Sequence, residues 1–256
     1  MRLILDDLGA APAGGGHLDD RALARLYAYP DGGRRPWLRA NMVSTIDGAA
    51  TGPDGRTGSI NNEADKRVFS LLRALADVIV VGAGTARAEG YRHPHPVKGE
   101  RAVLREGRPP APTLVVVSRS GNLPLGLAKG PDEEGAGEVL LATSEAADAH
   151  AVDAAREVLG EANVLVIGDD GVDQTTLVRH LVDRGMPRML TEGGPRLLRD
   201  MAAAGVLDEL CLTVVPHLLA GDHPRILTGH GVELSLSPRM LLEAEGTLLG
   251  RWLRDS

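Results

Sequence analysis

Hydrophobic residues occur along this chain in two patterns that alternate from about residue 37 onward. Short apolar runs, such as residues 78–81 and 114–117, contain no polar alternation, which is typical of strands buried on both faces of a parallel sheet. Between such runs, apolar residues recur at helical spacing, as they do in residues 68–75. This alternation predicts an α/β fold with a central, mainly parallel sheet and helices on both faces.

The same patterns predict the other elements and the domain organisation. We expect further strands at 3–5, 38–46, 137–142, 162–167, 189–190 and 210–215, and helices at 18–29, 144–159 and 175–183. A turn at Gly246 predicts a hairpin that adds antiparallel strands at the C-terminal edge of the sheet. The basic, proline-rich residues 98–112 are interpreted as a flexible loop. We therefore expect an N-terminal extension, residues 1–35, packed on one main domain, residues 36–256.

Two predicted strand-to-helix turns contain glycines. A strand at residues 189–190 stops at Gly193 and Gly194, and Pro195 then stands in a favoured first-turn position of a helix. Residues 82–86 repeat this arrangement. Glycines let a backbone approach a ligand closely, and free N–H groups at a helix start suit a diphosphate, so the turns favour a dinucleotide site. Plain tight turns are the alternative interpretation. Neither turn has the full Gly-x-Gly-x-x-Gly motif, which argues against an ordinary Rossmann dehydrogenase.

Composition narrows the class of partner. A net charge of −7 and an aromatic content of 2% argue against nucleic-acid binding. One cysteine, Cys211, allows no disulfide within the chain and is typical of a reducing cytoplasm. No apolar run approaches the ~20 residues of a membrane-spanning helix. His93 and His95 favour a surface loop over a metal site. We expect a cytoplasmic protein that binds a small-molecule substrate, without nucleic acid, membrane or metal.

Four motifs, in this order along the chain, resemble one known family. They are Ser44-Thr45-Ile46-Asp47-Gly48, Leu71-Leu72-Arg73, Val81-Gly82-Ala83-Gly84-Thr85 and Thr191-Glu192-Gly193-Gly194-Pro195. Over residues 37–250 the chain resembles the reductase domain of the riboflavin-pathway pyrimidine deaminase/reductase, which has the three-layer dihydrofolate reductase fold. The zinc deaminase half has no counterpart, because His-x-Glu and Pro-Cys-x-x-Cys are absent.

The resemblance implies an NADPH-dependent reductase that opens the ribose of 5-amino-6-(5-phosphoribosylamino)uracil to a ribityl chain. It implies cofactor contacts at the two glycine turns and nearby, namely at Val81, Gly82, Gly84, Thr85, Ser118, Glu192, Gly193, Gly194, Pro195 and Leu197. It implies substrate contacts at Asn41, Ser44, Ser59 and Arg73. An alternative role for Glu192 is to accept backbone N–H bonds that fix its own turn.

Asp47 and Glu89 are the predicted catalytic residues. Beside an apolar nicotinamide, a partly desolvated Asp47 carboxyl would favour its neutral form and donate a proton or hydrogen bond to a substrate nitrogen. Glu89 supplies an acid in Ala88-Glu89-Gly90, where the family commonly has Ala-Asp-Asp-Pro. The alternative for Asp47 is an Asp-Gly turn that only ends the strand.

Departures from the family pattern leave further functions open. Asn41 stands where the bifunctional members have lysine, and the segment after Thr85 is altered. A pterin such as dihydrofolate is therefore an alternative substrate for this fold, and a non-catalytic NADP(H)-binding sensor is an alternative from another class. Family members are commonly homodimers, and the apolar residues 210–219, placed at a sheet edge, predict a homodimer here.

Overall fold

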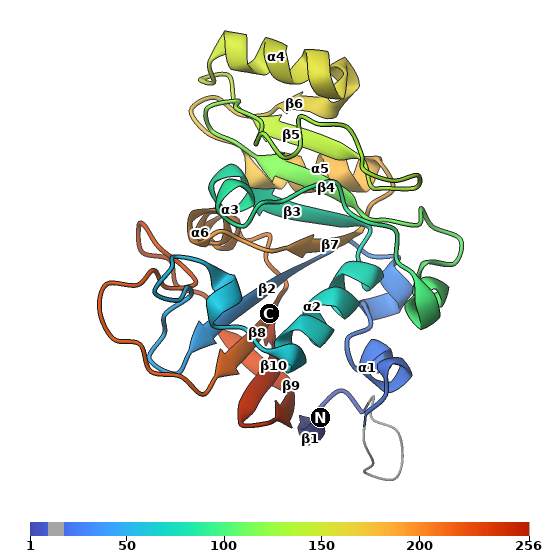
Figure 1. The fold of residues 1–256 in the computed structure, drawn as a ribbon, viewed down its shortest axis with the longest axis vertical. Coiled ribbons are helices and arrows are strands. Elements are labelled where there is room, and N and C mark those ends of the chain that lie inside the picture. Colours follow the sequence, from blue (N-terminus) through green and yellow to red (C-terminus); the bar gives the residue numbers. More distant parts are fainter. Residues whose placement is uncertain (10–17, 256) are drawn as a thin grey trace.

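One sheet runs through the described part of the chain, which is residues 1–9 and 18–255 of this computed structural model (Figure 1). In those ranges ten strands form it, in the order β1-β9-β10-β8-β2-β7-β3-β4-β5-β6. Their bounds are β1 Arg2–Asp6, β2 Trp37–Thr45, β3 Val78–Gly82, β4 Thr113–Val117, β5 Val139–Thr143, β6 Val164–Val166, β7 Arg188–Thr191, β8 Glu209–Val215, β9 Leu236–Ala244 and β10 Thr247–Arg254.

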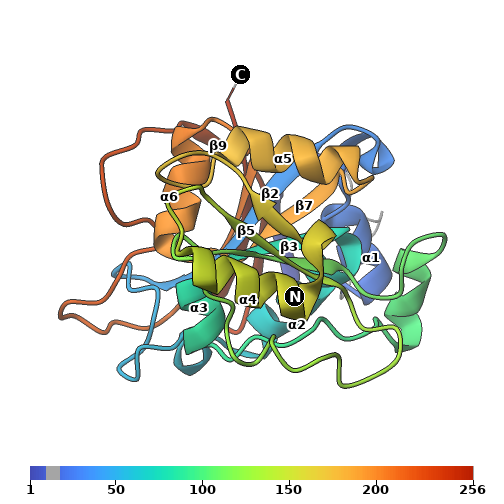
Figure 2. The ribbon, with the colours of Figure 1, turned by 90° about the horizontal axis from the view of Figure 1, so that it is seen from above.

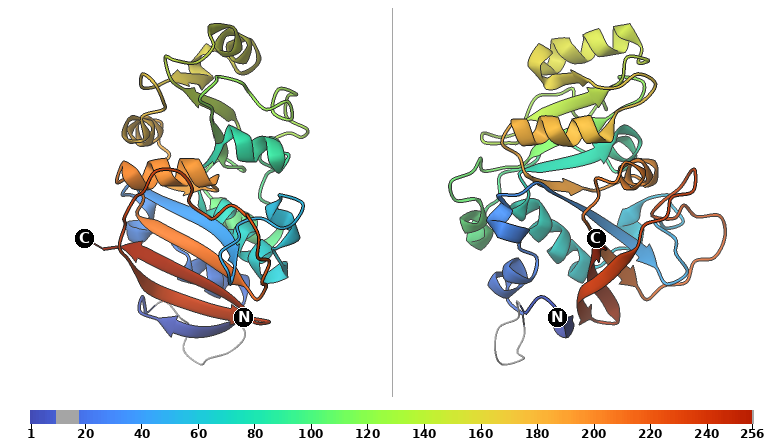
Figure 3. Two further views of the ribbon diagram at one scale, coloured as in Figure 1. Left: turned by 90° about the vertical axis from the view of Figure 1, so that its left-hand side faces the viewer. Right: turned by 180° about the vertical axis from the view of Figure 1, so that it is seen from behind.

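The strands from β8 to β6 are parallel, and β10, β9 and β1 continue the sheet in antiparallel pairing. A mainly parallel sheet with an antiparallel C-terminal edge is thereby confirmed. The predicted edge position of residues 210–215 is wrong, because β8 pairs with β2 on one side and with β10 on the other. Figure 3 shows β1 beside the C-terminal hairpin, at the outer edge.

Helices cover both faces of the sheet (Figure 2). Alternate residues of β3 face opposite layers: Ile79 and Val81 belong to the hydrophobic cluster on one face of the sheet, whereas Val78 and Val80 belong to the cluster on the other face. This is the three-layer arrangement that the β-branched run in β3 predicts. The helices are α1 Asp20–Leu26, α2 Glu63–Leu75, α3 Ala83–Ala88, α4 Ala149–Leu159, α5 Gln174–Asp183 and α6 Pro195–Ala203, and the short 3-10 helices are η1 Pro30–Gly33, η2 Thr57–Ser59, η3 Gly99–Arg105 and η4 Glu161–Asn163.

The N-terminal residues join the same core as the rest of the chain. Leu23 and Leu26 of α1 are fully buried, and β1 pairs with β9. The boundary between an extension and a main domain at residue 36 stays a prediction, and residues 10–17 of that extension lie outside the described ranges. No helix within the described ranges is long and apolar enough to cross a membrane.

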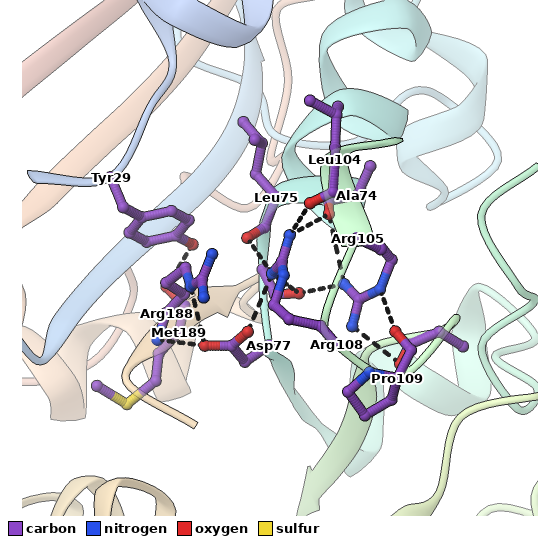
Figure 4. A network of polar contacts seen from close by, with 12 residues as sticks. Tyr29, Ala74, Leu75, Asp77, Leu104, Arg105, Arg108, Pro109, Arg188 and Met189 are labelled. Carbon is purple, nitrogen blue, oxygen red and sulfur yellow. Dashed lines mark hydrogen bonds and ion pairs between the residues drawn. The ribbon is translucent and has the colours of Figure 1, made fainter. Parts of the chain in front are cut away.

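Two local predictions differ from the structure. The helix expected from residue 144 begins at Ala149, because the Asp148 side chain caps it by accepting from the His150 N–H at 2.9 Å. The loop at 98–112 is not free: Arg105 is 4% exposed and donates to several backbone carbonyls, including that of Ala76 at 2.5 Å. Figure 4 shows Arg105 and Arg108 together, and Arg108 also pairs with Asp77 at 2.9 Å. These arginines satisfy the carbonyls that end α2 and so fix the loop to it.

Candidate active site

Among the described residues, two neighbouring cavities lie near the carboxyl ends of β2, β3 and β7. A small cavity of about 430 Å³ lies between β2, α2 and the loop after α3. A groove of about 1100 Å³ runs between the starts of α3 and α6. Thr85 lines both of them. Ligands of open parallel sheets bind at the carboxyl ends of the strands, so this edge is the candidate active site.

The two glycine turns meet at the groove. Gly82 donates its N–H to the carbonyl of Gly193 at 2.7 Å, which joins the end of β3 to the turn after β7. A Cβ atom built on Gly194 would lie 2.3 Å from Thr85 Oγ1. A side chain at position 194 would therefore displace the Thr85 hydroxyl, which lies where the two turns approach each other. Of the predicted cofactor residues, Gly82, Gly84, Thr85, Gly194, Pro195, Leu197 and Ser118 line the groove.

The groove suits an anionic ligand. Gly194 is the N-cap of α6 and offers no side-chain cap, so the first N–H groups of that helix are available to a ligand. The Arg199 Nε atom is buried without a partner. Arginines line the groove at Arg87, Arg119, Arg196 and Arg199, and carboxylates line it at Asp170 and Asp200. The exposed helix start, the close glycine turns and the cations fit a dinucleotide diphosphate.

Glu192 forms a buried ion pair on the wall of the small cavity. Its side chain is 2% exposed, and its two oxygens accept from Arg73 Nε and Nη2, each at 2.7 Å. The Tyr91 hydroxyl donates to the same carboxylate at 2.5 Å. Burial raises the pKa of Tyr91, and the adjacent carboxylate raises it further. Glu192 thus binds side chains rather than the backbone of its own turn, and it fixes Arg73 beside the cavity.

Other polar groups complete this cavity. Asn41 is 8% exposed and contributes from β2, and Glu89 accepts from the Thr57 N–H at 2.8 Å. Asn61 Oδ1 and His93 Nε2 are buried without a hydrogen-bond partner. Unpartnered buried polar atoms are costly, so these two are available to a bound ligand.

The cavity is also lined by residues that were not predicted for the site, among them Asp65, Asn61, Tyr91 and His93. A signal existed for Asp65. It stands three and seven positions before Val68 and Leu72, which are on the buried stripe of α2, and a carboxyl on an apolar stripe is unusual. No such signal marked Asn61, Tyr91 or His93, because their places depend on how the loops before α2 and after α3 meet.

The structure contradicts the prediction of a neutral Asp47 carboxyl. Asp47 is exposed and lines neither cavity. The Thr45 hydroxyl and the N–H groups of Ala220 and Leu219 donate to it and lower its pKa to about 2. In this structure it is therefore a carboxylate that binds the loop after β8, a contact that the turn interpretation did not include.

Several predicted contact residues do not line the cavities. Val81 is fully buried within β3, and Ser44 is 7% exposed within β2. Ser59 is exposed and donates to Asp54 at 2.7 Å. Neither cavity is lined by Val81, Ser44, Ser59 or Gly193. Their predicted ligand contacts stay predictions. Within the described residues, no cluster of three or more His, Cys, Asp or Glu side chains could hold a metal ion.

Comparisons with known proteins agree with this architecture. The family model described as the RibD C-terminal domain matches residues 36–245. A 2,5-diamino-6-ribosylamino-4(3H)-pyrimidinone 5′-phosphate reductase from Archaeoglobus fulgidus is 31% identical over 201 residues, which are 76% of this chain and 87% of that protein. A reductase of the same name from Methanothermobacter thermautotrophicus is 29% identical, over 84% of this chain and 94% of that protein.

Solved structures share the fold. A pyrimidine reductase-like protein from Corynebacterium diphtheriae superposes with a TM-score of 0.78 at 25% identity, over 91% of this chain and 98% of that one. The riboflavin biosynthesis reductase Rib7 of Saccharomyces cerevisiae superposes with a TM-score of 0.62 at 14% identity, over 91% of this chain and 98% of that one. The second likeness concerns the fold alone.

Proposed function

Because the chain belongs to the RibD C-terminal domain family, we propose that it reduces a ribosylaminopyrimidine 5′-phosphate of the riboflavin pathway with NADPH. The observation that carries the proposal is the junction of two unlike cavities at Thr85. A groove suited to a diphosphate adjoins a smaller cavity with buried polar groups. Hydride transfer needs this arrangement, because the donor carbon and the acceptor carbon have to meet at one point.

We propose that the cofactor is a nicotinamide dinucleotide and, more specifically, NADPH. When bound, NADPH supplies the hydride. The start of α6 would hold the diphosphate. Arg87 and Arg119 line the same groove and support the phosphorylated form, since guanidinium groups bind phosphate in a bidentate manner.

The small cavity supports a phosphorylated heterocycle as substrate. Its volume of about 430 Å³ lies within the range of small-molecule sites, roughly 300–1,000 Å³. Lys66, Arg73 and Arg92 line it and offer cations to a phosphate. Asn61 Oδ1 and His93 Nε2 offer unpartnered polar atoms to ring substituents. Two candidate substrates differ at one ring substituent. The pyrimidinone in the names of the archaeal relatives has an amino group where the uracil implied by the sequence resemblance has an oxygen.

The proposed reaction consumes one hydride and one proton. The C1′–O4′ bond of the ribose breaks, a C1′–H bond forms, and O4′ becomes a hydroxyl. Arg73, fixed by its two bonds to Glu192, would orient the substrate on the cavity wall. A proton has to reach O4′ as its bond to C1′ breaks, which calls for an acid in the same cavity.

The test is oxidation of NADPH or NADH by the purified protein with each of three substrates: the 2,5-diamino pyrimidinone, the aminouracil and dihydrofolate. We expect turnover with NADPH and at least one ribosylaminopyrimidine phosphate. Turnover with dihydrofolate alone would make the protein a pterin reductase. Tight NADPH binding with no turnover on any substrate would make it a sensor, and either result would overturn the proposal.

A matched pair of glycine variants tests the groove. Gly194→Ala places a methyl group against Thr85 Oγ1, whereas Gly130→Ala has no atom within 4 Å of the new methyl. We expect NADPH to bind Gly194→Ala about tenfold more weakly, equivalent to about 1.4 kcal/mol, and Gly130→Ala to bind normally. Unchanged calorimetric affinity in both variants would place the cofactor elsewhere.

A homodimer is part of the proposal. Ile46 is 62% exposed and Leu218 is 75% exposed, and the two lie close, because the Ile46 N–H donates to the His217 carbonyl at 3.1 Å. Exposed apolar pairs of this kind support a subunit contact. Light scattering at micromolar concentration is expected to give the mass of two chains, and the mass of one chain would refute it.

A further inference from the structure

Asp65 is a buried carboxyl on the wall of the small cavity. It stands in the first turn of α2 and is 5% exposed. The Asn62 side chain caps this helix by accepting from the Asp65 N–H at 3.1 Å, which fixes the backbone at that position. The carboxyl also interacts with the Thr213 hydroxyl of β8. Asp65 is therefore held between a helix start and the sheet, facing the ligand space.

The surroundings of Asp65 raise the pKa of its carboxyl above the ordinary value. Burial raises the pKa of this carboxyl, and the Thr213 hydroxyl and the Lys66 charge oppose that effect only in part. Lys66 pairs instead with Glu63, at 2.8 Å between Nζ and Oε1. A partly desolvated acid was predicted for this pocket at Asp47. The structure offers Asp65.

Other titratable groups face the same cavity, and each has at least one protein partner, although His93 Nε2 has none. Glu192 is bound by Arg73 and Tyr91, and Glu89 accepts from the Thr57 N–H. His95 contacts Glu133 at 2.5 Å, and His93 Nδ1 lies 3.1 Å from the Gly137 carbonyl. The remaining charged groups on the wall are the cations Lys66 and Arg92. Of the carboxyls, Asp65 alone combines burial, contact with the cavity and a raised pKa.

We propose that Asp65 is the general acid of the reduction, donating its proton to O4′ of the ribosylamine. This inference rests on the proposed function. As the C1′–O4′ bond breaks, its electron pair goes to O4′, which takes the Asp65 proton, and the nitrogen lone pair forms a C1′=N bond. C1′ would then accept the hydride that a bound reduced nicotinamide supplies, which forms the C1′–H bond, and the π electrons would return to nitrogen. The Asp65 carboxylate regains its proton from water.

The test compares Asp65→Asn with Glu63→Gln. Both replace a carboxylic acid by its amide in the first turn of α2, but the Glu63 side chain is 88% exposed. We expect Asp65→Asn to lower kcat by about 100-fold or more, as loss of a general acid does, with unchanged NADPH affinity. Glu63→Gln keeps the wild-type kcat. Asp65→Glu restores part of the rate, because it keeps the acid.

The pH profile separates an acid from a structural role. In the wild type, kcat falls as pH rises through the pKa of the acid, and Asp65→Asn loses this limb. Infrared difference spectra of the two proteins show independently whether Asp65 titrates above the exposed carboxyls. A wild type inactive on every ribosylaminopyrimidine would refute the proposed function. An active wild type with an equally active Asp65→Asn would refute only this inference, and loss of the limb in His93→Gln instead would assign the acid to His93.

Discussion

Two buried arginine–carboxylate clusters in this protein have the same chemistry and different surroundings. In the first, Glu209 on β8 binds Arg39 of β2 and Arg251 of β10, and the side chains of Glu209 and Arg39 are fully buried. In the second, Glu192 after β7 binds Arg73 of α2, whose side chain is 32% exposed. We call them the core cluster and the cavity cluster.

The two clusters differ in the groups that complete their hydrogen bonds. In the core cluster, the Trp37 indole also donates to Glu209 at 2.9 Å, and Arg39 donates to the Tyr27 carbonyl at 2.8 Å. Protein groups surround it on every side and join the N-terminal segment to the sheet. The cavity cluster instead has one side open to ligand space. We infer that the enclosed core cluster stabilises the fold, whereas the cavity cluster, which is accessible from one side, orients a bound ligand.

Removing the carboxylate of the core cluster is the strongest way to test this contrast. Glu209→Ala leaves two buried guanidinium groups without a counter-charge, and we expect the free energy of unfolding to fall by about 3–5 kcal/mol. Urea titration measures it. The control is Glu243→Ala, which removes the pair with the exposed Arg2 and a bond from the Gly246 N–H, and costs about 1 kcal/mol or less. Similar losses in both variants would contradict the role given to the core cluster.

The cavity cluster is expected to affect activity more than stability. Glu192→Gln keeps the shape of the side chain and removes the charge that fixes Arg73. Because water reaches Arg73, the unfolding free energy falls by only about 1–2 kcal/mol. Misplacement of Arg73 lowers kcat/KM by about 100-fold. Activity retained alongside a large loss of stability would place this cluster in the same class as the core cluster.

Acid pH tests the core cluster without mutation. Burial by itself raises the pKa of Glu209 above its ordinary value of 4.5. The charges and hydrogen bonds of Arg39 and Arg251 outweigh burial and bring this pKa down to about 2. A pKa that is lower in the folded state stabilises the protein above pH 4.5, and this stabilisation is lost as pH falls toward 2. Between pH 5 and pH 3 we expect the wild type to lose about 1–2 kcal/mol from this group, and Glu209→Gln to lack that part of the slope.

The sequence predicted what depends on local pattern. Local patterns predicted the β-branched strand β3, the amphipathic helix α2 and the two glycine turns. The predicted layers and sheet edge follow from these elements. Groups that depend on distant partners were missed. The apolar stripe of α2 marks Asp65 as an unusual acid, but the pattern does not show that Thr213 of β8 is its partner. From the sequence, Arg105 is one residue of a basic loop. Its hydrogen bonds to the carbonyls at the end of α2 depend on the tertiary structure.

We expect the smallest effect on activity from replacing Asp47, which belongs to neither cluster. Asp47 accepts hydrogen bonds from the Thr45 hydroxyl and from the N–H groups of Leu219 and Ala220, and it lines neither cavity. Asp47→Asn keeps one amide oxygen as an acceptor. We therefore expect kcat/KM within about threefold of the wild type, and no change of the pH profile above pH 4. Steady-state kinetics beside Asp65→Asn measure both variants on one scale. A loss at Asp47 as large as that at Asp65 would mean that the loop after β8 closes over the substrate and carries Asp47 to it.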